Sequence, residues 1–137
     1  MLPDESGRYA ALYRPIHMIG LELGVSVASA ALRREPTGAP TGWRSDVVAT
    51  AKRALREGEV LDGEGGYRVY GKQVPAARSL AEGLLPLGLA QNVRLKRDIA
   101  EGERLKWADV AYDAGALAVK VRREMEAAFS QPRQIVE

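Results

Sequence analysis

Three residues near the N-terminus, Tyr13, Arg14 and His17, carry side chains that can bind an anion and move a proton. Arginine presents a planar fork that grips phosphate or carboxylate, and histidine donates a hydrogen bond or transfers a proton near neutral pH. They lie beside Pro15, whose ring fixes the backbone angle φ. This spacing predicts a site for the phosphate end of a small molecule, with His17 catalytic and Tyr13 and Arg14 binding substrate.

A structural role for the same residues stays open. Arg14 could pair with an acid such as Glu22, and His17 could be a hydrogen-bonded structural residue. Glu22 follows His17 by five positions, so its carboxylate could orient the imidazole ring or cap a helix.

Other candidate residues are weaker. Trp43 and Trp107 could stack on a sugar ring, although single tryptophans more often anchor a core or an interface. Asp62 and Glu64, within a glycine-rich stretch, could bind a cation, but such pairs are more typical of turns. The chain has one histidine and no cysteine, so we expect neither a metal site nor thiol chemistry.

The charge balance and the apolar pattern restrict the partners. Twenty basic against eighteen acidic residues give a net charge of +2, which argues against nucleic-acid binding. The longest apolar stretch, 16–32, is interrupted by His17 and Glu22 and is too short to cross a membrane comfortably. The N-terminus lacks the order of a signal peptide. We therefore expect a cytoplasmic protein with no nucleic-acid and no membrane partner.

Composition divides the 137 residues into three parts: an arm over 1–45, a glycine-punctuated segment over 46–113, and a helix with a tail over 114–137. The middle segment carries Val, Tyr and Leu at period two, which predicts strands over 46–52, 67–71 and 92–99.

Two helices are expected outside the middle segment. In the last part Leu117, Val121, Met125 and Phe129 recur at every fourth position, which predicts an amphipathic helix over 114–129. Small residues and alanines predict a second helix over 24–34 in the arm.

A ten-residue internal repeat is the most informative pattern. The segment 52–61, KRALREGEVL, resembles the segment 96–105, KRDIAEGERL, at six of ten positions. Each copy follows a strand-like run and contains an apolar residue, a Glu-Gly pair and a second apolar residue. We interpret the pair as strand, tight turn and apolar anchor used twice in a pseudo-symmetric β unit. The alternative for its Lys, Arg and Glu residues is a solvated surface.

The segments 51–63 and 85–110 resemble the SAF domain, named for sialic-acid-synthase-like, antifreeze and flagellar-chaperone members. That family has a β-clip fold, in which a long hairpin folds back on itself. The resemblance implies an α+β chain: a small SAF-like β-clip unit over 46–113, flanked by the N-terminal helical arm and the C-terminal amphipathic helix.

The segment 12–22, LYRPIHMIGLE, resembles a stretch in NAD(P)-dependent oxidoreductases whose N-terminal half is homoserine-dehydrogenase-like and precedes a SAF domain. This group includes the alternative 1-deoxy-D-xylulose 5-phosphate reductoisomerases of isoprenoid biosynthesis. The resemblance implies a C-terminal portion of such an enzyme, which completes the substrate site through Tyr13, Arg14 and His17 and helps to assemble a dimer.

The chain departs from the complete enzyme because it carries no dinucleotide fingerprint. The glycine cluster over 63–66 has Arg68 where the last glycine of G-x-G-x-x-G is required. We therefore expect no cofactor in this chain, NAD(P)H in the full-length parent, and little activity of the chain alone. The expected partners are the N-terminal dinucleotide-binding half, a phosphorylated or acidic small-molecule substrate and a second copy of the chain.

An alternative is a stand-alone SAF module that binds an acidic sugar or a protein partner without catalysis. In the first interpretation the arm packs against the missing half, so we expect an exposed apolar surface on it. We also expect the isolated chain to self-associate, through either the small-residue face over 24–32 or the apolar stripe of the C-terminal helix.

Overall fold

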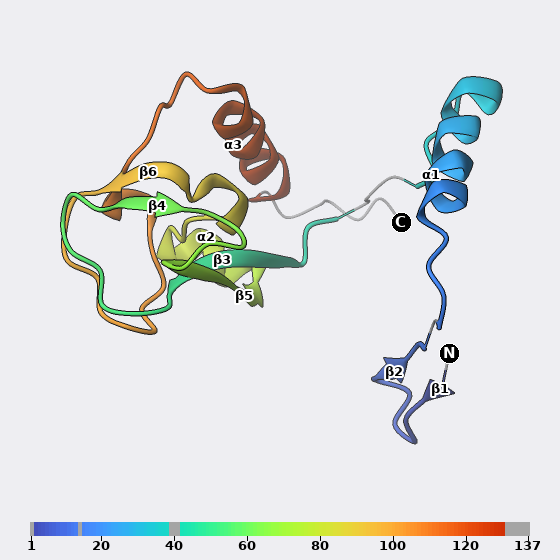
Figure 1. The fold of residues 1–137 in the computed structure, drawn as a ribbon, viewed down its shortest axis with the longest axis horizontal. Helices are drawn as coiled ribbons and strands as arrows, with labels where there is room; N and C mark the ends of the chain where they lie inside the picture. The colour runs from blue at the N-terminus through green and yellow to red at the C-terminus, as the bar shows by residue number, and fades with distance from the viewer. Residues whose placement is uncertain (1, 14, 39–41, 131–137) are drawn as a thin grey trace. The chain divides into compact units, whose positions relative to one another are not determined.

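The computed structural model describes residues 2–13, 15–38 and 42–130, and the chain divides into two compact units, 1–40 and 41–137. Helices and small antiparallel sheets make up the described chain (Figure 1), so the expected α+β class is confirmed. No helix in the described ranges has the length and apolar character needed to cross a membrane.

The first unit, 1–40, contains a short hairpin and one helix. Strand β1 (Leu2–Pro3) pairs antiparallel with β2 (Ala10–Ala11). Helix α1 (Ile19–Ala28) continues into a π-helical turn, η1 (Ser29–Arg33). The helix expected over 24–34 is present, but its start is wrong. It begins earlier because two glycines are tolerated inside it, each at a cost of roughly 1 kcal/mol, and its regular part ends before the wider last turn.

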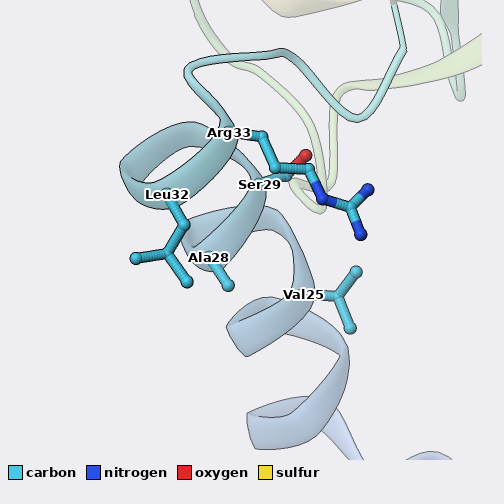
Figure 2. Close-up of a pocket in the computed structure, with 5 residues that line it drawn as sticks. All are labelled: Val25, Ala28, Ser29, Leu32 and Arg33. Atoms are coloured by element: carbon cyan, nitrogen blue, oxygen red, sulfur yellow. The ribbon is translucent and has the colours of Figure 1, made fainter.

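Helix α1 exposes all its large apolar side chains. They are 58–75 % exposed and are Ile19, Leu21, Leu23, Val25 and Val27. Among the described residues of this unit only Ser29 is buried. It lines a cavity of about 270 Å³ with four neighbours (Figure 2), which are Val25, Ala28, Leu32 and Arg33. The exposed apolar surface expected on the arm is therefore present, and the described part of this unit has no core of its own.

The described part of the second unit, 42–130, contains five strands, two helices and two 3₁₀ turns. In chain order these are β3 (Ser45–Ala51), β4 (Val60–Asp62), β5 (Val69–Pro75), α2 (Ala76–Glu82), η2 (Leu87–Leu89), β6 (Gln91–Leu95), η3 (Trp107–Asp109), β7 (Val110–Ala111) and α3 (Leu117–Ser130). Strand β3 pairs antiparallel with β5 along its whole length, and β6 lies between β4 and β7. Each expected strand is present, although β5 runs further and β6 ends earlier than the alternation indicates.

Helix α2 was not predicted from the sequence. Seven residues are too few to establish a helical period. Its local signals are the preceding Pro75 and Gly83, which ends the helix with a left-handed φ of 62°. The helix matters because it places Ser79, a buried residue, beside β3.

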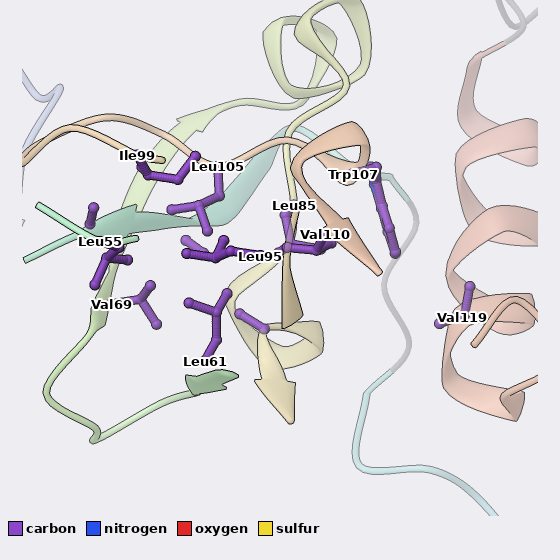
Figure 3. Close-up of a cluster of buried hydrophobic side chains, with 13 residues drawn as sticks. Leu55, Leu61, Val69, Leu85, Leu95, Ile99, Leu105, Trp107, Val110 and Val119 are labelled. Atoms are coloured by element: carbon purple, nitrogen blue, oxygen red, sulfur yellow. The ribbon is translucent and has the colours of Figure 1, made fainter. Parts of the chain in front are cut away.

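The two copies of the repeat meet at equivalent positions. Leu55 and Ile99 form an antiparallel bridge in which each N–H donates to the other's carbonyl oxygen at 2.9 Å. The later anchors, Leu61 and Leu105, are also fully buried. Figure 3 shows all four side chains in one cluster. The repeat is therefore structural, with a pseudo-two-fold axis between Leu55 and Ile99.

The turns of the repeat use glycine for a backbone conformation that other residues adopt with strain. Gly58 and Gly102 have φ values of 84° and 76°. The N–H of Gly58 donates to the carbonyl of Leu95, and that of Gly102 donates to the carbonyl of Ala51, both at 2.9 Å. The symmetry thus extends to the turns, because all four residues occupy equivalent positions in the two copies.

The turn conformation predicts a matched pair of substitutions. Gly58→Ala and Gly102→Ala should each lower the free energy of unfolding by roughly 1 kcal/mol, because alanine is strained at positive φ. No atom crowds either position, so the cost is conformational. Gly88→Ala is the control, because Gly88 is also uncrowded but has no positive φ. Urea denaturation measures the three values, and equal effects at all three positions would contradict the argument.

Helix α3 begins at Leu117, later than expected, after a turn in which the Asp113 carboxylate accepts the Gly115 N–H at 2.7 Å. The first half of its apolar stripe does not face the core, because Leu117 is 76 % and Val121 53 % exposed, whereas Met125 and Phe129 are half-buried. Val119, which lies off that stripe, is the buried apolar residue. The helix therefore turns a different face inward from the one that its apolar stripe marks.

Candidate functional site

The two described residues of the predicted substrate site, Tyr13 and His17, lie on the open surface of the first unit. Tyr13 is 87 % exposed, and Arg14 lies outside the described residues. His17 is exposed, and its Nδ1 lies 3.9 Å from Oε2 of Glu22. A cavity of about 350 Å³ includes Glu22 and is otherwise apolar, with Ile16, Met18, Leu21 and Val25 as its other lining residues.

Among the described residues of this site, the structure brings His17 close to Glu22, as expected. At 3.9 Å the two atoms are beyond hydrogen-bond distance, so the carboxylate acts on the imidazole through its charge. The exposed imidazole therefore lies beside a carboxylate. Such a group can donate to an anion or transfer a proton to a molecule that covers this surface.

A buried ionic cluster in the second unit holds α3 against β3 and α2. The Arg122 guanidinium donates from Nη1 and Nη2 to the Asp46 carboxylate, at 3.1 and 2.5 Å. Ser79 Oγ donates to the same carboxylate at 2.6 Å, and Arg122 Nε donates to Oε1 of Glu126 at 2.7 Å. The bidentate geometry sets the rotation of α3 about its own axis.

Both charges of this central pair are stabilised in their ionised forms. Burial disfavours the Asp46 carboxylate, but the hydrogen bonds from Arg122 and Ser79 outweigh it and lower the pKa of Asp46. Burial likewise opposes the charge on Arg122, yet its bonds to Asp46 and Glu126 raise the pKa of the guanidinium. A pair held in this way keeps its charges near neutral pH, so its role is structural.

The two tryptophans anchor α3 through cation–π contacts with two arginines of that helix, Arg122 and Arg123. The Arg122 guanidinium lies 4.6 Å from the centre of the Trp43 ring, and that of Arg123 lies 4.0 Å from the centre of Trp107. Tyr112 meets Trp107 edge to face at 4.8 Å. These contacts favour the anchoring interpretation of the tryptophans over sugar stacking.

Asp62 closes the glycine-rich turn over 63–66. Its carboxylate oxygens accept the N–H groups of Tyr67 and Arg68, at 2.7 and 3.1 Å. A Cβ at Gly66 would lie 2.2 Å from Asp62 Cγ, so the loop is filled by this carboxylate. Within the described ranges no group of three or more His, Asp or Glu side chains could hold a metal ion. The turn-forming alternative for Asp62 is the one that these contacts favour.

The charged residues of the repeat brace its turns. In the first copy Glu59 accepts hydrogen bonds from Arg53 Nη2 at 2.7 Å and from the Arg56 N–H at 2.8 Å. In the second copy Glu103 accepts from Arg97 Nη2 at 2.6 Å and from the Ala100 N–H at 3.0 Å. Two arginine–glutamate pairs of the repeat, Arg53–Glu59 and Arg97–Glu103, are therefore more than a solvated surface.

The ionic cluster could not be predicted from the sequence, because Asp46 and Ser79 are far from Arg122 in the chain. Arg122 and Asp46 are 76 positions apart. The local signal is the spacing of Arg122 and Glu126, which are four positions apart on one helix face. That spacing is equally typical of a surface pair, so burial alone distinguishes the two.

Comparison with models of known protein families and with curated proteins finds no match for this chain.

The cluster predicts a large effect of removing its cation. Arg122→Ala should lower the free energy of unfolding by roughly 3 kcal/mol, because it leaves the buried Asp46 carboxylate without its cation, whereas Glu126 keeps its pairing with Arg123. Chemical denaturation measures the change, and Lys72→Ala, an exposed cation on β5, is the control. A loss as small as that of the control would show that the cluster does not hold α3.

The repeat turns predict a dependence of stability on pH. Hydrogen bonds from Arg53 above all, and from the Arg56 N–H, lower the pKa of Glu59 from its ordinary 4.5 to about 2. The resulting stabilisation is complete above the ordinary pKa and is lost as the pH falls toward 2. Denaturation of the wild type and of Glu59→Gln should therefore differ most near neutral pH and converge at acid pH. Glu101→Gln, an exposed control, should not change the pH profile, and parallel profiles for Glu59→Gln would contradict the assignment.

Proposed function

We propose that this chain is the C-terminal, SAF-like portion of an NAD(P)-dependent oxidoreductase of the homoserine-dehydrogenase-like group, which includes the alternative 1-deoxy-D-xylulose 5-phosphate reductoisomerases. In this proposal the arm completes the substrate site and the second unit serves assembly. A separate dinucleotide-binding half supplies the hydride donor, NAD(P)H.

The observation that carries the proposal is the exposure of α1 directly after the segment 12–22. A helix that is apolar on every side is stable when protein surrounds it, yet its large apolar side chains are all exposed. The exposed surface continues before the helix through Leu12, Ile16 and Met18. Exposed apolar patches above roughly 300–600 Å² mark interaction surfaces. A folded partner that covers this surface would also form the second wall of a pocket at Tyr13 and His17.

The glycine-rich turn over 63–66 does not fit the phosphates of a dinucleotide. The glycine-rich turn over 63–66 is the nearest pattern to a phosphate-binding loop, and the Asp62 carboxylate already takes the N–H groups of Tyr67 and Arg68 there. A second anion at this place would meet the charge of Asp62. The proposal therefore assigns cofactor binding wholly to the other half.

The substrate chemistry proposed for the arm follows from its side chains. Arg14 anchors a phosphate or carboxylate through its planar fork, and Tyr13 contributes a second donor. His17, beside the Glu22 carboxylate, donates to the same anion or transfers a proton during reduction or oxidation. The proposed substrate class is accordingly a phosphorylated or acidic small molecule.

The pseudo-symmetric pairing of the two repeats supports the SAF-like part of the proposal. The Leu55–Ile99 bridge and the equivalent glycine turns bring the two copies together as a hairpin folded back on itself would. In this proposal the enzyme is a cytoplasmic homo-oligomer, and the second unit provides its assembly surface.

A stand-alone SAF module that binds an acidic sugar or a protein partner is the second candidate. One observation favours it: the main buried core is complete within the second unit, from Ala49 to Val119. A self-sufficient unit can act without a partner half. This candidate gives no role to the exposed apolar helix α1, which is why we rank it second.

Complementation tests the proposal directly. Mixing the chain with the nucleotide-binding half of an enzyme from this group should give a stable complex and NAD(P)H-dependent turnover of a phosphorylated or hydroxy-acid substrate. Leu23→Glu on α1 should weaken the complex at least tenfold, because it buries a charge in the apolar contact. Tyr67→Glu, at an exposed aromatic residue of the second unit, should leave it unchanged.

Substitutions at the site separate binding from catalysis in the complex. Arg14→Ala should raise KM, and His17→Gln should lower kcat and alter its pH profile. Unchanged kinetics for both variants would show that the proposed site is wrong. Absence of any complex, together with binding of an acidic sugar by the chain alone, would favour the stand-alone module.

A further inference from the structure

Helix α3 exposes two large apolar side chains to solvent while two of its charged side chains are largely buried. Leu117 and Val121 are exposed and Met125 is half-buried, whereas Arg122 and Glu126 point into the unit. The apolar face forms one wall of a groove of about 750 Å³, whose other residues are Pro86, Gly88, Leu89, Ala118 and Arg122. The ionic cluster with Asp46 holds this orientation, so the exposed stripe is a fixed feature of the fold.

The groove is suited to an apolar occupant. Its one charged lining residue is Arg122, and the guanidinium of that residue is already bound by Asp46 and Glu126. A polar or anionic ligand would compete with these two carboxylates for the same donors. The rest of the lining is aliphatic, proline, methionine or glycine, so burial of apolar surface would drive the association.

Two opposite charges flank the stripe and indicate which occupant fits. Lys120 and Glu124 are exposed, and within the described ranges neither has an ion-pair partner. They lie four positions apart, on one side of the stripe, with Val121 between them in the sequence. When two copies of α3 pack antiparallel across a two-fold axis, Lys120 of each copy faces Glu124 of the other.

We propose that α3 is the homodimer face of this protein, occupied by α3 of a second copy in antiparallel orientation. Leu117, Val121 and Met125 of each copy pack against the stripe and groove of the other, and two symmetric Lys120–Glu124 pairs set the register. The 14-residue helix is about 21 Å long, which gives the contact several turns on each side. The inference rests on the homo-oligomer part of the proposed function and is independent of its catalytic part.

A substitution in the stripe tests the face. Val121→Glu should raise the dissociation constant of the self-associated chain at least tenfold in sedimentation experiments. Val25→Glu, at a similarly exposed valine on α1, is the matched control and should leave self-association unchanged. Near-UV circular dichroism of Trp43 and Trp107 reports whether α3 stays docked. A docked Val121→Glu variant with wild-type self-association overturns the proposal, as does an effect confined to Val25→Glu.

Charge exchange tests the antiparallel pairing. Lys120→Glu and Glu124→Lys should each weaken self-association several-fold, because each places like charges opposite one another. Mixed together, the two single variants should associate as tightly as the wild type, and the double variant should recover self-association. Single variants that behave like the wild type, or that fail to rescue each other when mixed, overturn the antiparallel arrangement.

The nucleotide-binding half distinguishes this proposal from the preceding one. Val121→Glu should still bind that half, whereas Leu23→Glu should still self-associate. If Val121→Glu instead loses the half and keeps self-association, the groove belongs to the half and the homodimer proposal fails. Failure of the half to bind any variant would count against the oxidoreductase proposal alone.

Discussion

The reciprocal bridge between Leu55 and Ile99 is the contact on which the second unit depends. Each residue gives one N–H and one carbonyl to the other, so two distant copies of a short sequence become a single β framework. The apolar residues that follow in each copy then meet in one core. Because separation of the copies would expose backbone groups and core side chains together, the framework forms or fails as a unit.

The ionic cluster around Arg122 determines which face of α3 is exposed to solvent. An amphipathic helix ordinarily buries its apolar stripe, but the bidentate bond to Asp46 and the stacking on Trp43 turn the charged face of α3 inward. The hydrophobic free energy of burying the apolar stripe is therefore not used in folding and could drive association with another surface. Stability of the unit and the proposed binding of a second copy therefore involve opposite faces of one helix.

The arm and the second unit have different physical characters, and the functional proposals follow from that difference. Helix α1 is apolar with no buried residue, which is why we propose a protein partner for it and a second wall for the proposed catalytic residues next to it. The second unit has a closed core and brings rigidity to the assembly. If the arm carries the substrate site and the second unit carries the dimer face, two different surfaces would serve catalysis and assembly.

Local sequence determined the parts of this protein that depend on neighbouring residues. Alternation of apolar and polar residues predicts the strands, and the four-residue interval between Leu117 and Val121 predicts a helix. The ten-residue repeat predicts two equivalent turns. Tertiary structure alone decided the rest: which face of α3 is buried, that Asp46 meets Arg122, and that the carboxylate of Asp62 fills a glycine-rich turn. The physical reason is that spacing records which side chains share a face, whereas the inward face is chosen by partners many positions away. The same reason limits what the sequence says about the substrate site. Residue types and spacing identify Tyr13, Arg14 and His17 as candidates, but they do not identify the surface that would complete a pocket around them.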